Sequence, residues 1–163
     1  MRIGVLSDTH LTMSGDQKGI DRIFMQQFAN VDMILHAGDF VELEVFDPLI
    51  DGKRFIGVAG NMDGHGVRDV MPVKRILDLE GFRIGLIHGW GSPWGIEDRV
   101  AGEFEGVDAI VYGHTHNPSC ERKGSVLFFN PGSPTDRRFA KFRSVGFLEL
   151  NETIEGRIVR LDS

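Results

Sequence analysis

Short apolar segments recur along the chain, and glycine or polar residues end each of them. Five of these segments are rich in isoleucine, valine and leucine: RIGVLSD, VDMILHAGD, RFIGVAGN, FRIGLIHG and DAIVYGH. Segments of this length and composition are typical of strands buried in a sheet. After the first of them, KGIDRIFMQQFAN has a near-helical spacing of Ile20, Ile23, Phe24, Gln27 and Phe28, with Asn30 as a stop signal. Alternating strands and helices in the first half favour a parallel sheet.

Two further segments are helix candidates, of which EVFDPLI is the weaker, and the second half of the chain has a different pattern. EVFDPLI contains a proline, and WGIEDRVAGEFEG is a third helix candidate. VKRILDLEGFRIGLIHG predicts two strands joined at Glu80–Gly81, and three more strands are expected in GSVLFFNPGS, SVGFLEL and GRIVRL. We therefore expect an α/β protein in which a second, more antiparallel sheet packs against the first.

Composition narrows the class of protein. The length of 163 residues fits one domain, spanning 1–163, at roughly 150 residues per domain. A net charge of −6 gives no general attraction to nucleic acid or to acidic membranes. Cys120 is the single cysteine, which excludes an internal disulfide and suits a reducing compartment. No apolar segment approaches the length of a membrane span, and MRIGVLSDTH lacks the apolar region of a signal peptide, so we expect a cytoplasmic protein.

Metal-ligating side chains gather where the predicted strands end. The segments SDTH, HAGD, GNMD, HGWG and GHTH supply seven such residues: Asp8, His10, Asp39, Asn61, His88, His114 and His116. Sites in open α/β sheets form at the carboxyl ends of strands, and two carboxylates placed together there need a cation. A single Asp or His is more often a turn or hydrogen-bonding residue, but turns do not require histidine. Mixed nitrogen and oxygen ligands favour Mn, Fe, Co, Ni or Zn over Ca or Mg.

The spacing within each pair allows two geometries. Asp8 and His10 are two residues apart, as are His114 and His116. In an extended segment both members of a pair point to one face, whereas a turning chain lets a pair straddle two neighbouring ions. Gly113 would let the backbone bend before His114 without steric strain.

Three other features have both structural and functional interpretations. His36 and His65 are assigned mainly structural roles, with His36 packing or orienting Asp39. The GWGSPWG loop is interpreted equally as a hydrophobic lid over the core edge or as one wall of a substrate cleft. NPGSPTDRRF is interpreted as a structural turn, with Arg137 or Arg138 as a secondary candidate for a substrate phosphate.

The ordered motifs D-x-H, G-D, G-N-x-D, H-G and G-H-x-H resemble the calcineurin-like metallophosphoesterase superfamily. They occur here as SDTH, AGD, GNMD, HG and GHTH, within positions 1 to about 135, followed by NPGS. Each motif alone is weak, but the complete ordered set is specific. The short length and the absence of a helical cap resemble the small phosphodiesterases of the YfcE and MJ0936 type. The resemblance implies two mixed β-sheets packed as a sandwich flanked by helices (αββα).

The resemblance also implies a ligand set and a reaction. Asp8, His10 and His116 would hold one divalent ion, and Asn61, His88 and His114 a second, with Asp39 bridging the two. Manganese is the favoured ion, with Ni, Fe, Co and Zn as alternatives. Two ions about 4 Å apart would clamp a phosphoryl oxygen and generate hydroxide from a bridging water, which attacks a small phosphate ester. Asp39, Asn61 and His114 are the expected catalytic residues.

One position departs from the superfamily pattern. Many members carry histidine after the asparagine of G-N-x-D, where this chain has Met62, which cannot donate a proton. His65 is a possible substitute, and Asp63 is expected to orient its neighbours. A phosphomonoesterase on the same site and a non-catalytic scaffold of the retromer-subunit type are the alternatives. The sequence leaves the natural substrate, the native metal and the oligomeric state open.

Overall fold

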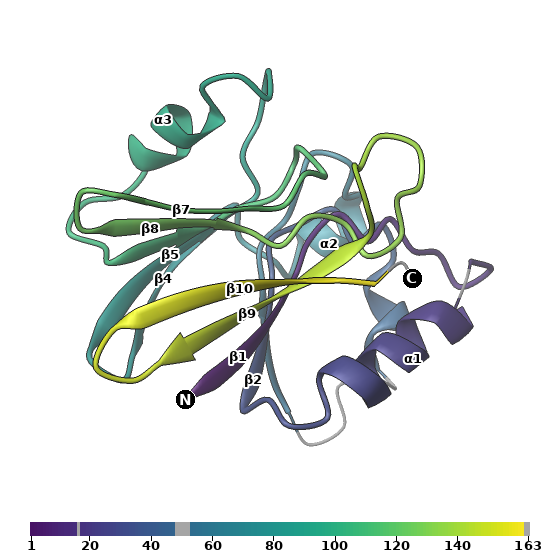
Figure 1. Cartoon of the computed structure of the whole chain (residues 1–163). Helices are drawn as coiled ribbons and strands as arrows, with labels where there is room; N and C mark the ends of the chain where they lie inside the picture. The colour runs from purple at the N-terminus through teal and green to yellow at the C-terminus, as the bar shows by residue number, and fades with distance from the viewer. Residues whose placement is uncertain (16, 48–52, 162–163) are drawn as a thin grey trace.

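Two five-stranded sheets form the centre of the structure, a computed structural model that describes residues 1–15, 17–47 and 53–161 (Figure 1). The first sheet has the order β10-β9-β1-β2-β3, with β1 Arg2–Leu6, β2 Met33–His36, β3 Arg54–Gly57, β9 Ser144–Leu150 and β10 Ile154–Arg160. The second has the order β4-β5-β6-β8-β7, with β4 Lys74–Leu79, β5 Phe82–Ile87, β6 Ala109–Val111, β7 Ser119–Lys123 and β8 Val126–Asn130.

Each sheet is mixed and has three parallel strands. In the first sheet β1, β2 and β3 are parallel, while β9 and β10 are antiparallel additions beside β1. In the second sheet β5, β6 and β8 are parallel, and β4 and β7 form antiparallel edges. The expected fold class, two mixed sheets packed as a sandwich with flanking helices, is confirmed.

The expected second sheet is present, but it is not more antiparallel than the first, since each sheet has two parallel and two antiparallel pairings. The expectation that the last strands of the chain belong to the second sheet was also wrong. Strand β9 pairs with β1, with Arg2 opposite Glu149, so the last two strands extend the first sheet. Helix α3, Ile96–Ala101, lies in the connection between β5 and β6, and a connection of this length allows these strands to be parallel. The hairpin predicted at Glu80–Gly81 is present, with Leu79 opposite Phe82.

Buried side chains from both sheets fill the space between them. Val5 and Leu35 of the first sheet and Leu86, Val111 and Phe129 of the second belong to this inner core. Since successive side chains in a strand point to opposite faces, the alternate positions need cover on the outside. These strands are therefore buried on both faces, which explains their continuous apolar sequences.

Helices cover the outer faces of the two sheets. Helix α1, Gln17–Gln27, contributes Ile20, Ile23 and Phe24 to a cluster that also contains Ile34 of β2. Helix α3 packs Ile96 and Val100 in the cluster that contains Ile110 and Phe128 of the second sheet. Figure 1 shows α1 and α3 on opposite sides of the paired sheets. The fold therefore has the four layers that the resemblance implies.

The predicted helices are present in different lengths. Helix α1 covers most of the segment expected for it. The segment 44–50 overlaps a 3₁₀ helix, Leu43–Val45, and its last residues lie outside the described part of the chain. Helix α3 ends earlier than expected, with Gly102 as its C-cap. Helix α2, His65–Arg68, and strand β7, which is mostly polar and exposed, were not predicted. No helix among the described residues is long and apolar enough to span a membrane.

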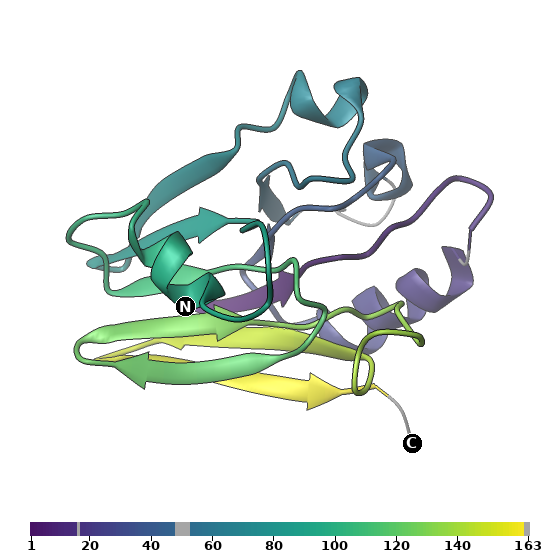
Figure 2. The same cartoon turned by 90° about the horizontal axis from the view of Figure 1, so that it is seen from above.

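The arrangement brings the ends of parallel strands from both sheets together. The β7–β8 and β9–β10 hairpins lie side by side along one edge of the sandwich (Figure 2). Asp8, just after β1 in the first sheet, contacts His116, which follows β6 in the second. The two sheets therefore place the carboxyl ends of their parallel strands, and the loops that carry the predicted ligands, at one end of the sandwich.

Candidate metal centre

The structure brings all seven predicted residues together in loops at one end of the sandwich. Each loop follows the carboxyl end of a parallel strand: β1, β2 and β3 in the first sheet, β5 and β6 in the second. Each of these side chains lies within 4 Å of at least one other member of the set: Asp8, His10, Asp39, Asn61, His88, His114 and His116.

Five of these residues have left-handed backbone conformations. The φ angle is 54° at Asp8, 46° at His10, 59° at Asp39, 70° at His114 and 58° at His116. Residues with a Cβ rarely adopt this region, and such conformations cost of order 1–3 kcal/mol each. The chain therefore turns at both D-x-H and H-x-H, so the extended alternative was wrong. Strained backbone conformations of this kind are common at active sites and ligand-binding sites, where the position of a side chain determines function.

Gly113 is required for space rather than for bending. The positive φ angles fall on His114 and His116, and Gly113 is not among the positive-φ glycines. A Cβ on Gly113 would lie 2.0 Å from Oγ of Ser7 and 2.8 Å from Oδ2 of Asp8. The expectation that Gly113 supplies the bend was wrong, because its role is to let the β6 loop approach the β1 loop.

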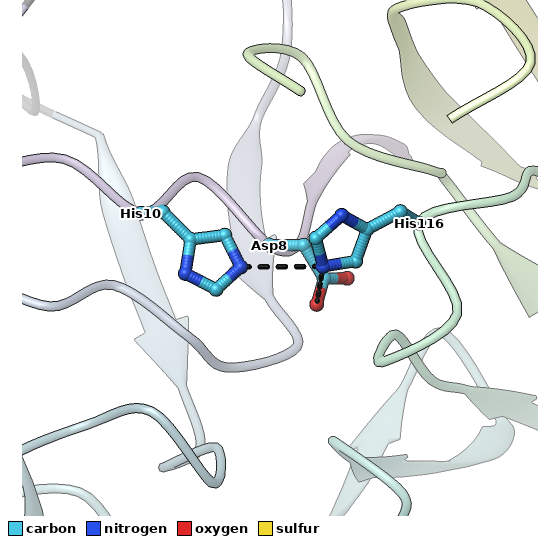
Figure 3. A group of neighbouring side chains, drawn as sticks. All are labelled: Asp8, His10 and His116. Carbon is cyan, nitrogen blue, oxygen red and sulfur yellow. Dashed lines mark hydrogen bonds and ion pairs between the residues drawn. The ribbon is translucent and has the colours of Figure 1, made fainter. Parts of the chain in front are cut away.

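The first group of acceptor atoms comprises Asp8, His10 and His116 (Figure 3). Nε2 of His10 lies 3.3 Å from Nε2 of His116, which lies 3.4 Å from Oδ1 of Asp8. Figure 3 shows the two imidazoles facing each other, with the carboxylate beside His116. The backbone N–H of His114 donates to both carboxylate oxygens, at 3.2 and 3.0 Å, and holds the Asp8 side chain in this position.

The second group comprises Asn61, His88 and His114. Oδ1 of Asn61 lies 3.0 Å from Nε2 of His88 and 3.0 Å from Nδ1 of His114. His88 is buried, whereas the Asn61 side of this group is open to solvent. His114 and His116 thus belong to different groups, as expected if the chain turns between them.

Asp39 lies between the two groups. Its Oδ2 is 3.6 Å from Nε2 of His10 and 3.3 Å from Nε2 of His88. Its Oδ1 accepts the backbone N–H of Met62 at 2.8 Å. Asp8 also approaches the second group, with Oδ1 3.8 Å from Nε2 of His88. The two groups therefore form one continuous cluster, in which both Asp39 and Asp8 have a carboxylate oxygen within 4 Å of a histidine nitrogen in each group.

Hydrogen bonds on the far side of three imidazoles determine which nitrogen faces the cluster. Nδ1 of His88 is 2.7 Å from the carbonyl oxygen of Ala37, and Nε2 of His114 is 2.8 Å from that of Gly91. Nδ1 of His116 is 2.5 Å from Oδ2 of Asp136. Since a carbonyl or carboxylate can only accept, the proton of each neutral ring lies on this outer nitrogen. The inner nitrogen then presents a lone pair, as a metal ligand requires.

The donor set fits divalent transition ions. Nε2 of His10 and Nε2 of His116 lie 3.3 Å apart, and two acceptors meet there unless His10 carries its proton on Nε2. Without a cation, the inward lone pair of His88 Nε2 would face Oδ1 of Asn61 at 3.0 Å. Such contacts between acceptors are unfavourable unless a proton or a metal ion lies between them. Imidazole nitrogens combined with carboxylate and amide oxygens suit Mn, Fe, Co, Ni and Zn.

The charges of the cluster also call for a cation. Burial raises the pKa of Asp8 above its ordinary value, and His88 and Ser7 offset this only in part. Burial opposes ionisation of Asp39 as well, but hydrogen bonding to His88, the His88 charge and the Met62 N–H together lower its pKa. Burial disfavours protonation of His88, yet the hydrogen bond to Asp39 and the two carboxylate charges raise its pKa. The site therefore stabilises positive charge among its acceptors.

Asp63 ties two of the loops together, as expected from its position. Its Oδ2 accepts the backbone N–H of Asp39 at 3.0 Å and of Gly60 at 2.7 Å. Its Oδ1 accepts the N–H of Val41 at 2.8 Å. These bonds connect the loop after β2 to the loop after β3, so Asp63 positions Asp39 relative to Asn61.

The segment after β8 supports the site in a way that the sequence did not reveal. Asn130 donates to the carbonyl oxygen of Gly113 at 2.9 Å, and Ser133 Oγ donates to that of Asp8 at 2.7 Å. Asp136 bonds His116 directly. This segment was interpreted mainly as a turn, and its single carboxylate near two prolines is the only sequence signal that could have singled out Asp136.

His36 and the tryptophan loop have distinct roles. His36 is fully buried, stacks on Phe40 with ring centroids 3.7 Å apart and contacts Thr9 Oγ1 through Nε2 at 3.0 Å. Burial, reinforced by the nearby His88, lowers its pKa well below the ordinary value, so His36 is a neutral packing residue. Trp90 lines a pocket with Asn61 and His88, which favours the cleft-wall interpretation of that loop over the lid.

Comparison with known protein families shows to which family a chain with this fold and this cluster belongs. Residues 1–153 match the Calcineurin-like phosphoesterase superfamily domain. The chain belongs to this family. The resemblance noted in the sequence is thus confirmed, and the chain is a metallophosphoesterase in fold and family.

Two relatives and two solved structures illustrate this membership of the metallophosphoesterase family. The probable metallophosphoesterase MJ0623 of Methanocaldococcus jannaschii is 35% identical over 99% of this chain and 82% of its own length. Phosphodiesterase MJ0936 of the same organism is 29% identical over 81% of this chain and 83% of its own. The structure of an archaeal phosphodiesterase superposes with a TM-score of 0.77, at 25% identity, over 99% of this chain and 100% of that one. Vps29 from Entamoeba histolytica with Zn²⁺ shares the fold at a TM-score of 0.71 and 22% identity, over 99% and 100% of the two chains.

Proposed function

We propose that this metallophosphoesterase is a phosphodiesterase that acts with two divalent transition-metal ions on a small phosphate-ester substrate. Asp8, His10 and His116 would hold one ion, Asn61, His88 and His114 the other, and Asp39 both. Manganese is the favoured ion. The observation that carries this proposal is the position of Asp39 Oδ2 between inward-facing nitrogens of His10 and His88, at 3.6 and 3.3 Å.

The residues of the cluster would divide the work of hydrolysis. Two divalent ions held by these residues would lower the pKa of a water and withdraw charge from the phosphate. Asp39, held by Met62 N–H, keeps the two ligand groups in register. Asn61 turns Oδ1 inward, which leaves its amide nitrogen available to donate to a phosphate oxygen at the open rim. The carbonyl oxygen of Gly91 holds the His114 ring, which keeps Nδ1 of His114 beside Oδ1 of Asn61.

Among the described residues, no side chain at the cluster is placed to donate a proton to the leaving group. The Met62 side chain is 59% exposed and carries no acidic proton. His65 is the first residue of α2 and is exposed, and no hydrogen bond joins it to the cluster among the described residues. Esters with acidic leaving groups, which depart without protonation, should therefore be the best substrates.

The experiment compares bis(4-nitrophenyl) phosphate with 4-nitrophenyl phosphate on protein reconstituted with Mn²⁺, together with elemental analysis. We expect two ions per chain and a higher kcat/KM for the diester. A higher kcat/KM for the monoester would establish the phosphomonoesterase alternative. Two bound ions without hydrolysis of either ester would support the non-catalytic scaffold, and a chain that retains no ion would refute the metal centre itself.

A further inference from the structure

A pocket of about 680 Å³ opens beside the first ligand group, and His10 and His116 form part of its wall. It lies between α1, the segment 134–139 and the end of β10. Five arginines line it: Arg22, Arg137, Arg138, Arg143 and Arg160. Within the described ranges, Asp136 is the single carboxylate that lines it, and it is already bonded to His116.

Four of these arginines have no acidic partner among the residues that the structure describes. Within the described part of the chain, Arg22, Arg137, Arg138 and Arg160 form no ion pair, and all four are exposed. The guanidinium of Arg160 lies 5.0 Å from the Phe142 ring centroid, and aromatic contact restricts its position without neutralising it. A protein with a net charge of −6 thus concentrates unpaired positive charge beside its metal cluster. An anionic ligand would relieve this repulsion.

A second pocket adjoins the other ligand group and has a different character. Its volume is about 290 Å³, and Asn61 and His88 form part of its wall. Met71, Val73 and Trp90 give it an apolar surface. The two ligand groups therefore face two different environments, one cationic and one apolar and aromatic. A phosphate held at the cluster would have one ester substituent on each side.

We propose that the substrate is an asymmetric phosphodiester, an inference that rests on the proposed function. One ester group carries an additional phosphate, which binds in the arginine pocket. The other is apolar or aromatic, lies against Trp90 and leaves. Hydrolysis breaks the bond between phosphorus and the oxygen of this second group, and water supplies the new oxygen on phosphorus. Its proton passes to the leaving oxygen or to solvent, and the phosphate-bearing monoester remains.

Two nitrophenyl esters that differ by one phosphate test this directly. The 4-nitrophenyl ester of thymidine 5′-phosphate is compared with the same ester carrying a 3′-phosphate, on the Mn²⁺-loaded enzyme. We expect kcat/KM to be about tenfold higher for the 3′-phosphorylated ester, because several exposed ion pairs of modest individual strength act together. The double variant Arg22→Gln, Arg160→Gln should reduce this ratio towards one. Arg54→Gln, an exposed arginine on β3 outside the pocket, is the matched control and should keep it.

A binding measurement separates this inference from catalysis. Thymidine 3′,5′-bisphosphate should raise the Tm of the metal-loaded protein more than thymidine 5′-phosphate does, and the double variant should lose the difference. Equal kcat/KM for the two esters with wild type, or equal Tm shifts, would overturn the inference while leaving the phosphodiesterase intact. Absence of hydrolysis of either ester and of bis(4-nitrophenyl) phosphate would instead refute the proposed function.

Discussion

Asp136 accepts a hydrogen bond from Nδ1 of His116, with 2.5 Å between the oxygen and nitrogen. The carboxylate also accepts backbone N–H groups of Arg138 at 2.7 Å and Phe139 at 3.1 Å. Partial burial opposes its ionisation, but these backbone bonds and the bond from His116 lower the pKa of Asp136 below its ordinary value. Asp136 is therefore ionised at neutral pH, and it directs the lone pair of His116 Nε2 towards Asp8.

Asp136→Asn should weaken metal binding rather than abolish catalysis. The amide can still accept from Nδ1, but it lacks the charge that makes the imidazole a strong ligand, and such partners are typically worth about 10- to 100-fold in affinity. The Mn²⁺ concentration for half-maximal activity should rise by that factor, with most activity restored at saturation. Asp98→Asn, an exposed carboxylate on α3, serves as control. Unchanged Mn²⁺ affinity would mean that the contact is merely structural.

Asp39→Asn should abolish phosphodiesterase activity while preserving the fold. The amide oxygen can retain the bond from Met62 N–H, so the loop keeps its geometry, but the negative charge facing His10 and His88 is lost. We expect a fall of at least about 10³-fold in kcat, of the size seen when a group stabilising the transition state is removed. Circular dichroism and elemental analysis should accompany the assay. Near-normal activity at equal metal occupancy would contradict a bridging role.

Asp8→Asn should stabilise the metal-free protein and destabilise the metal-loaded one. Asp8 is fully buried, and its pKa is raised from 3.8 in the folded chain. Its protonated form therefore favours folding, and this stability is lost as the pH rises from 3.8 through the raised pKa. An asparagine amide can also donate to the lone pair of His116 Nε2, which removes an unfavourable contact.

Thermal unfolding in the presence of a chelator tests this change. His36 and the other titrating groups are present in both proteins, so their effects largely cancel in the difference, and His88, whose pKa is raised from 6.5, stays protonated in the folded state below that pH. As the pH rises above 3.8, the Tm advantage of Asp8→Asn should grow, with about 2–4 °C for each kcal/mol in a chain of this length. Saturating Mn²⁺ should reverse the order of the two proteins. A pH-independent difference would show that charge burial at Asp8 is not the cause.

The sequence predicted the strands and their polar ends well because both have local signatures. Segments such as RIGVLSD end where the strand leaves the core, and Asp8 or His114 follows directly. The assignment of β9 to the first sheet had no such signature, since antiparallel pairing with β1 depends on contacts between residues about 145 positions apart, such as Arg2 and Glu149. The same applies to Asp136 and to the arginine pocket, which tertiary structure assembles from α1, β10 and a loop.

Met62→His should change how the enzyme depends on its leaving group. The Met62 backbone N–H donates to Asp39 at 2.8 Å, and its side chain is 59% exposed. An imidazole there would stand at the rim beside Asn61, where it could protonate a departing alkoxide. A positioned general acid typically contributes about 10²–10⁴-fold, so the gain should be largest for poor leaving groups.

The measurement is kcat/KM for a series of aryl phosphodiesters of increasing leaving-group pKa, with wild type, Met62→His and Met25→His. Met25 is 78% exposed on α1, so its replacement controls for an added surface histidine. Wild type should lose activity steeply as the leaving-group pKa rises, because no group protonates the leaving oxygen, and the slope for Met62→His should be shallower. A flat dependence in wild type would mean that another residue already donates the proton. His65, the nearest exposed histidine in sequence, would then be replaced next, and a steep slope in His65→Gln would assign the donation to it.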